Sequence, residues 1–110
     1  MSSRKYIKRI WRVPKDQGPV IYFAALLVKK LVKHGWPAES HMIDLEYDYL
    51  FEVRYKDREK LPPDFENALE IACRVVARTY RVDVTQSGGF ICLNRPYRVG
   101  AGGHFIEVKA

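Results

Sequence analysis

Residues 41–55, HMIDLEYDYLFEVRY, show the clearest periodicity in the chain. Apolar and aromatic side chains fall on every second position, and most of the positions between them carry a charge. The apolar set is Ile43, Leu45, Tyr47, Tyr49, Phe51, Val53 and Tyr55, and the charged set is Asp44, Glu46, Asp48, Glu52 and Arg54. A side-chain period of two is typical of a β-strand with one buried face. We therefore predict one long strand over 41–55, with a bend or bulge near Asp48.

Two helices are predicted, one before and one after this strand. The first begins near Pro19 and stops at Gly35, which supplies a left-handed C-terminal cap. Its apolar stripe consists of Ile21, Phe23, Ala24, Leu27, Val28, Leu31 and Val32. The second opens at Pro62, Pro63 and Asp64. Its predicted buried face is Phe65, Leu69, Ala72, Val76 and Tyr80, and its exposed face is Glu66, Glu70, Arg74 and Arg78.

Shorter strands are expected in the rest of the chain. Residues 5–13 mix apolar and basic positions up to Pro14, where a strand would end. Near the C-terminus, the turn signal Ser87-Gly88-Gly89 separates a strand at Val82 and Val84 from a returning strand over 90–93.

Residues 95–103 are predicted to form a loop and residues 104–108 a final strand. The element order is then β-α-β-α-β-β-β. Because the late connections are too short for parallel crossovers, we expect an α+β fold with two helices packed on one face of a mostly antiparallel sheet. A chain of 110 residues has room for one domain, spanning residues 1–110.

The charge balance and the apolar runs indicate the setting in which the chain works. A net charge of +6 favours an anionic partner or surface. The longest apolar run, residues 20–28, is much shorter than the roughly 20 residues that span a bilayer. We expect no membrane span and a soluble protein that stays in the cytoplasm.

The two cysteines, Cys73 and Cys92, lie among apolar neighbours and are not in a CxxC arrangement. We interpret them as reduced, packed thiols, although a disulfide between them stays open. No GxSxG, Walker A or GxGxxG motif is present, and neither cysteine lies near a histidine in the sequence. Nucleophilic catalysis and nucleotide binding are therefore not indicated.

A metal site is one candidate for chemistry. Zinc takes three or four protein ligands, and His41, Asp48 and His104 would supply three. On an unbroken strand, however, positions 41 and 48 point to opposite faces, which argues against their convergence. In the alternative interpretation His34 is a helix C-terminal cation, His41 begins a strand and His104 packs into the sheet.

The acidic side chains of the long strand are a second candidate. Asp44, Glu46, Asp48 and Glu52 share one face, where neighbouring carboxylates can form an acid/base pair. The alternative is the ordinary polar face of an antiparallel sheet.

Nucleic-acid binding is a third candidate, based on the basic N-terminus. Phosphates would be neutralised, and bases stacked, by Arg4, Lys5, Lys8, Arg9, Arg12 and Lys15 together with Tyr6 and Trp11. The alternative is a solvated edge strand, on which lysine discourages aggregation.

Two parts of the chain carry a family resemblance. These are IWRVPKDQGPV with the following helix and KHGWPAES, and DFENALEIACRVVARTYRVDV with the SGG turn and the closing GGHFIEV. Together they resemble the phage-encoded branch of the zinc D-alanyl-D-alanine carboxypeptidase and L-alanyl-D-glutamate endopeptidase family. If the chain is a zinc peptidase, the resemblance implies His41, Asp48 and His104 as the zinc ligands. Glu107 or Glu46 would then be a doubtful candidate for the catalytic base.

The chain also departs from the family's metal motif, S-x-H-x-x-G-x-A-x-D. Asp44 and Glu46 stand where the motif has Gly and Ala, and Ser40 is adjacent to His41 instead of two residues before it. The family's acidic base precedes the last histidine, where this chain has only glycine and alanine at positions 100–103. A zinc peptidase needs a base to activate the metal-bound water, so the resemblance implies a shortened relative that has lost its chemistry.

The first hypothesis is therefore a small non-catalytic phage or prophage protein that acts through protein–protein contacts or self-assembly, with no cofactor. It would be cytoplasmic or part of a virion. The predicted interaction residues are Arg4, Lys5, Lys8, Arg9, Trp11, Arg12, Tyr47, Tyr49 and Tyr55. The tyrosines are equally consistent with ordinary core. The alternatives are a zinc peptidase that cuts peptidoglycan stem peptides and a nucleic-acid-binding module.

Overall fold

The computed structural model of the chain describes residues 17–43 and 50–109. It has an α+β fold, as the sequence predicts. Its elements are α2 (Gln17–Lys33), β1 (Ala38–Met42), β2 (Leu50–Tyr55), a short 3-10 helix η1 (Arg58–Lys60), α3 (Phe65–Tyr80), β3 (Val84–Ser87), β4 (Phe90–Leu93), β5 (Tyr97–Val99) and β6 (Phe105–Glu107). The strand predicted over 5–13 lies outside the described residues.

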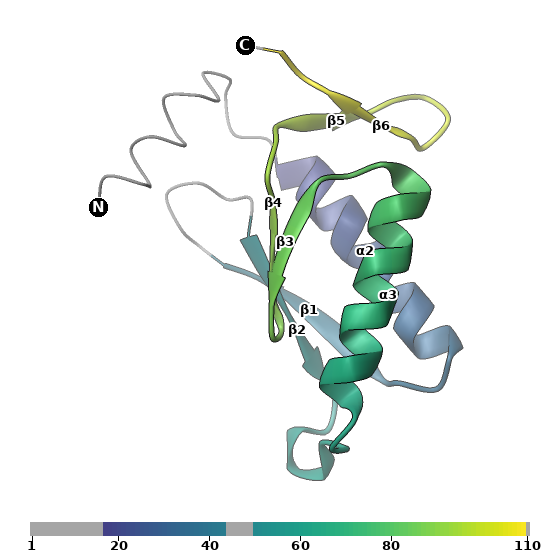
Figure 1. Ribbon diagram of the computed structural model, residues 1–110, viewed down its shortest axis with the longest axis vertical. Helices are drawn as coiled ribbons and strands as arrows, with labels where there is room; N and C mark the ends of the chain where they lie inside the picture. Colours follow the sequence, from purple (N-terminus) through teal and green to yellow (C-terminus); the bar gives the residue numbers. More distant parts are fainter. Residues whose placement is uncertain (1–16, 44–49, 110) are drawn as a thin grey trace, which may run out of the picture.

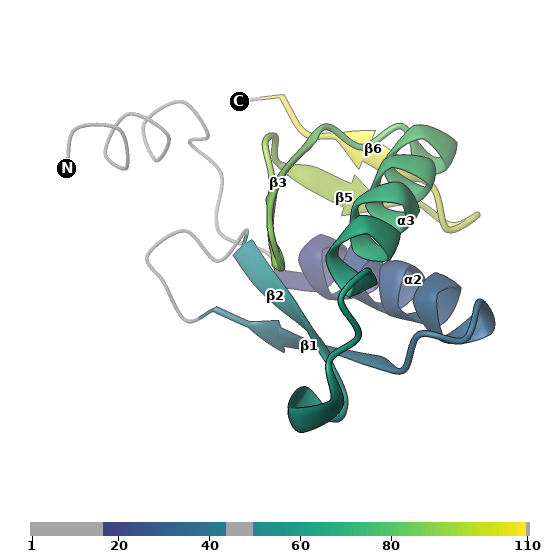
Figure 2. The ribbon, with the colours of Figure 1, turned by 60° about the horizontal axis from the view of Figure 1, so that its bottom comes forward.

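The strands form two antiparallel sheets. The larger has the order β1-β2-β4-β3, and the smaller pairs β5 with β6. Helices α2 and α3 lie side by side on one face of the larger sheet (Figures 1 and 2). That face supplies Phe51 and Val53 from β2 and Ile91 and Leu93 from β4 to the core.

The single long strand predicted over 41–55 is wrong. Met42 is opposite Phe51 and Ala38 is opposite Tyr55, so β1 and β2 run antiparallel and the chain reverses between residues 43 and 50. The alternation did not reveal this reversal, because it keeps one phase in the sequence from Ile43 to Tyr55. The structure instead places Met42, an even-numbered position, opposite the buried Phe51. The predicted inward positions Phe51 and Val53 are nonetheless buried.

The loop predicted over 95–103 is also incorrect in part, since it contains β5. Tyr97–Val99 pairs with Phe105–Glu107, and the glycine-rich residues between them form the turn. Gly103 in this turn has a φ of +79°, which glycine adopts without strain. A strand as short as β5 leaves little alternation to recognise.

Helix α2 ends where the sequence predicts. Gly35 has a φ of +88°, and the backbone N–H of Trp36 donates to the carbonyl oxygen of Leu31 at 2.9 Å. The predicted apolar stripe is partly wrong, because Ile21 and Val32 are 50% and 53% exposed. Apolar residues lie almost all round this helix, so their spacing does not identify the buried face. The core residues of this helix are Val20, Phe23, Ala24, Leu27 and Leu31, and Pro19 in its first turn is buried as well.

Helix α3 has the predicted buried face. Phe65, Leu69, Ala72 and Val76 are buried, and Tyr80 packs against the core. The exposed face carries the expected ion pair between Arg74 and Glu70, whose Nη2 and Oε2 atoms are 3.3 Å apart. The predicted returning hairpin is confirmed as well, with Ser87 opposite Phe90 across the turn at Gly88 and Gly89.

Candidate functional site

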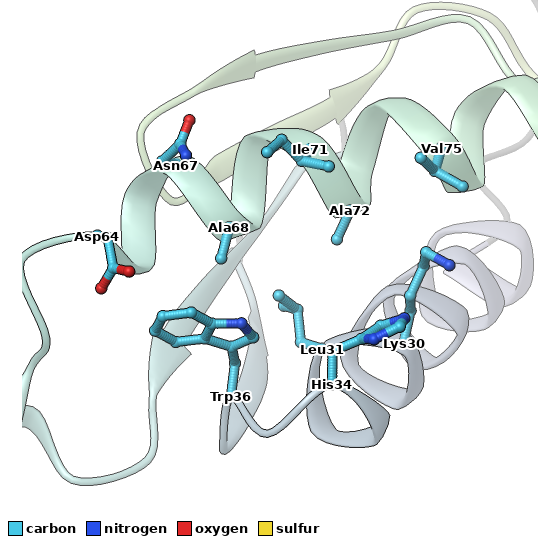
Figure 3. Close-up of a pocket in the computed structure, with 10 residues that line it drawn as sticks. All are labelled: Lys30, Leu31, His34, Trp36, Asp64, Asn67, Ala68, Ile71, Ala72 and Val75. Atoms are coloured by element: carbon cyan, nitrogen blue, oxygen red, sulfur yellow. The ribbon is translucent and has the colours of Figure 1, made fainter.

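A groove lies between the C-terminal half of α2 and the outer side of α3. It encloses about 460 Å³. Figure 3 shows Leu31 and Trp36 below α3, with Ala68 and Ala72 pointing toward them from above. Among residues 17–43 and 50–109, the lining is Lys30, Leu31, His34, Trp36, Asp64, Asn67, Ala68, Ile71, Ala72 and Val75. Most of these side chains are apolar, so this depression exposes a hydrophobic surface.

Helix packing sets the depth of this groove. Trp36 follows the Gly35 cap and packs against Phe65 at the start of α3, with the ring centroids 6.3 Å apart. On the α3 side, Ala68 and Ala72 carry the smallest side chains and leave the space open. Ile71 and Val75 remain 50% and 38% exposed at the rim, although both are large apolar residues.

The groove continues along the seam of the two helices. A second depression is lined by Leu26, Lys29, Lys30, Lys33, Val75, Val76, Thr79 and Tyr80. Lys30 and Val75 line both parts, so the two parts are contiguous. We call the combined feature the interhelical groove. It follows α3 from Asp64 to Thr79.

One rim of the interhelical groove is basic. Helix α2 contains no acidic residue, and it contributes Lys29, Lys30 and Lys33, followed by His34. We call these four residues the basic rim. None of the three lysines forms an ion pair with another residue in 17–43 or 50–109.

The opposite rim, on α3, is nearly uncharged. It consists of Asn67, Ile71, Val75 and Thr79, with Asp64 at the Trp36 end. The carboxylates of α3 itself face elsewhere: Glu66 and Glu70 line separate depressions on the other side of the helix.

The outer face of the larger sheet is a second polar surface. His41 Nε2 is 2.6 Å from Glu39 Oε2, and Arg54 donates to Glu52 Oε1 at 2.7 Å. Across the strands, Glu39 is opposite Arg54 and His41 is opposite Glu52. Each carboxylate on this surface therefore has a polar partner, Arg54 or the His41 imidazole, and such cross-strand pairing is common on an exposed sheet face.

The structure does not bring the described members of the predicted metal site together. His41 lies on β1, while His104 lies in the turn between β5 and β6 with its ring over Gly100. Glu107, the doubtful base, is 3.5 Å from Arg95 Nη1. Within residues 17–43 and 50–109, no three His, Cys, Asp or Glu side chains form a group that fits a metal ion.

Asp48 and Glu46 lie outside the described residues. The chain reverses between β1 and β2, so residues 41–55 are not one unbroken strand. The strand geometry that was expected to keep His41 and Asp48 on opposite faces therefore does not apply. The shared acidic face predicted for this strand also depended on its being straight, and of its four members only Glu52 is described.

Tyr55 is the one predicted interaction residue that the structure describes. Its ring lies edge-on to Phe65 at a centroid distance of 5.2 Å, and it packs against the core. This favours the core interpretation of Tyr55. The other predicted interaction residues lie outside the described part of the chain: Arg4, Lys5, Lys8, Arg9, Trp11, Arg12, Tyr47 and Tyr49.

Both thiols are free, as expected. Burial raises the pKa of Cys73 to about 11 and raises the pKa of Cys92 as well. Cys73 is buried and Cys92 is partly buried, and a thiol that keeps its proton is a weaker nucleophile than a thiolate.

Ile71, Val75 and the basic rim were not identified as site residues from the sequence. One signal was available: Ile71 and Val75 are four residues apart and lie outside the predicted buried stripe of their helix. Two exposed apolar residues at helical spacing mark a second apolar face.

Comparison with protein-family models, curated proteins and solved structures found no match. Neither α2 nor α3, the α-helices in the described part of the chain, has the length and hydrophobicity needed to cross a bilayer. The geometry of the described residues is therefore the basis for assigning a function.

Proposed function

We propose that this chain is a non-catalytic protein that acts through protein–protein contacts, with the interhelical groove as its contact surface. The observation that carries the proposal is the exposure of Ile71 and Val75 beside a rim of lysines that have no ionic partner in the described chain. Exposed apolar side chains flanked by polar residues are typical of binding surfaces.

The shape of the groove favours a polypeptide over a compact ligand. Its two parts join end to end along the helices, and it is open to solvent along α3, where Ile71 and Val75 are exposed. Grooves between helices commonly hold an extended or helical segment of another protein. The polar side chains Lys30, His34, Asp64 and Asn67 are distributed around the edge, whereas small-molecule sites usually direct a few polar groups at one point.

The biological setting comes from the family resemblance in the sequence. A peptidase-like scaffold without its catalytic base is suited to a structural or assembly role in a phage or prophage, because binding sites can be acquired on an inherited fold. The partner is then a second virion component or another copy of this chain.

Site-specific photo-crosslinking in the cells that naturally produce the protein tests this proposal. The crosslinking amino acid is placed at Ile71, with Ile21 as the matched control, because both isoleucines are 50% exposed. We expect a discrete protein adduct from position 71 that is lost in a Val75→Asp background and is absent from position 21. Equal adducts at both positions, or none at position 71, would refute the groove as the contact surface.

A further inference from the structure

We infer that the occupant of the interhelical groove is an amphipathic helix with carboxylates along one flank. This inference rests on the proposed function and specifies its partner. It follows from the dimensions of the groove and from the distribution of charge along its rims.

The spacing of the α3 side chains matches a helical ligand. Asn67, Ile71, Val75 and Thr79 recur every four residues along the rim, and Ala68, Ala72 and Val76 line the groove beside them. From Asp64 to Thr79 this is about 22 Å of helix, or about four turns. An apolar stripe at i, i+3, i+4 and i+7 on a ligand helix of the same length would fill the groove.

The charges determine which flank of the ligand carries acids. Lys29, Lys30 and Lys33 stand on the α2 side, and the α3 side from Asn67 to Thr79 is uncharged. Carboxylates on the ligand flank that faces α2 would meet three lysines with no other ionic partner in the described chain. The carboxylate of Asp64 lies at the end of the groove near Trp36, where it would repel carboxylates of the ligand. The acidic residues of the ligand are therefore expected toward the other end, beside Lys29 and Lys33.

A nucleic acid is a poorer fit for this surface. The backbone of a polyanion would engage the basic rim, but the opposite rim at Ile71 and Val75 is apolar and offers it no charge. The apolar surface would then stay exposed to water, whereas a helix with an apolar stripe covers it.

The test uses the full chain and two fluorescein-labelled helical peptides. Both carry leucines at i, i+3, i+4 and i+7; one has glutamates along one flank and its twin has lysines there. Affinity is measured by fluorescence anisotropy. We expect the glutamate peptide to bind at least about tenfold more tightly, and Lys30→Glu with Lys33→Glu to reverse this preference.

Three variants distinguish the role of the groove from the role of charge. Ile71→Asp is expected to abolish binding of the glutamate peptide, while Ile21→Asp retains it. Lys56→Glu with Lys60→Glu makes the same charge change away from the groove and is expected to preserve the preference. Circular dichroism and thermal unfolding establish that each variant is folded, and Val75→Asp replaces Ile71→Asp if the latter is not.

The outcomes separate the two proposals. If neither peptide binds, or if both bind equally, the acidic helix is ruled out, while crosslinking at Ile71 still supports the groove. If an oligonucleotide or an anionic phosphatidylglycerol vesicle binds through the lysines and Ile71→Asp has no effect on it, the inference is overturned. If crosslinking at Ile71 fails as well, the proposed function fails with it.

Discussion

Phe105 and Tyr97 face each other edge-on, with their ring centroids 6.0 Å apart and their planes at 86°. Phe105 also contacts the rings of Tyr22 and Phe23 on α2 and of Tyr80 at the end of α3. The β5–β6 pair shares no strand with the larger sheet (Figure 1). These aromatic contacts therefore attach it to the helices. The Tyr22 hydroxyl adds a hydrogen bond to the Gly103 carbonyl oxygen at 3.0 Å.

Phe105→Ala is expected to detach this hairpin from the helices. Phe105 is partly buried against the core, so the substitution should lower the free energy of unfolding by about 2 kcal/mol, less than for a fully buried phenylalanine. Urea denaturation measures the loss, and hydrogen exchange should show faster exchange at the β5 and β6 amides. Val99→Ala is the control, because Val99 is 38% exposed on the neighbouring strand, and a change of less than about 0.5 kcal/mol is expected there. Equal effects of the two substitutions would contradict the anchoring role of Phe105.

Two adjacent glycines should differ in how much stability they lose on substitution. A Cβ at Gly89 would lie 2.6 Å from the carbonyl oxygen of Val53, so Gly89→Ala must displace the backbone of β2 or β4. We expect a loss of about 1–3 kcal/mol from overpacking, measured by thermal unfolding. Gly88 has a φ of +57°, and a Cβ there would lie 3.8 Å from Glu66 Oε1, which is an ordinary contact distance. Asparagine tolerates the left-handed conformation better than most residues, so Gly88→Asn should cost less stability than Gly89→Ala. A reversed order of the two effects would contradict this hairpin geometry.

Stability should fall in alkaline solution because of Cys73. Its pKa rises from an ordinary 9.0 to about 11 on burial, so the folded state holds the thiol proton more tightly than the unfolded state does. The resulting stabilisation is complete below about pH 9 and is lost as the pH rises toward 11, at a total of about 1–3 kcal/mol.

Urea denaturation across this pH range measures the effect. Cys73→Ala should be less stable at neutral pH, because it leaves a cavity, yet it should lose less stability between pH 9 and 11 than the native chain. Burial also raises the pKa values of Cys92 and Tyr97, which contribute to the pH dependence that remains in the variant. Identical slopes for the two proteins would show that Cys73 does not titrate as described.

Zinc binding distinguishes the proposed function from a peptidase. His41 is engaged by Glu39 and His104 lies in the turn of the other sheet, so we expect no stoichiometric zinc after dialysis and no effect of His104→Ala on the metal content. Elemental analysis measures the metal. One equivalent of zinc that disappears in His104→Ala would instead support the peptidase, with Asp48 as the next ligand to test.

Local signals predicted much of the fold. Three features depend on residues that are close together in the sequence. They are the end of α2 at Gly35, the buried stripe of α3 and the hairpin at Gly88 and Gly89. The site was predicted far less well. The sequence did not identify the interhelical groove, because its two helices are separated along the chain and only their packing makes one surface of Ile71, Val75 and the lysines of α2.

The sequence by itself determined the α+β class, the positions of both helices and the strands β3 and β4, because caps, turns and side-chain periodicity act over a few residues. Only the tertiary structure decided the reversal after Met42, the sheet order β1-β2-β4-β3 and the pairing of β5 with β6. It also decided that α2 and α3 lie together with lysines on one rim and apolar residues on the other. These features depend on contacts between segments that are remote along the chain, and an alternating pattern is the same in a straight strand and in two strands that fold back on each other.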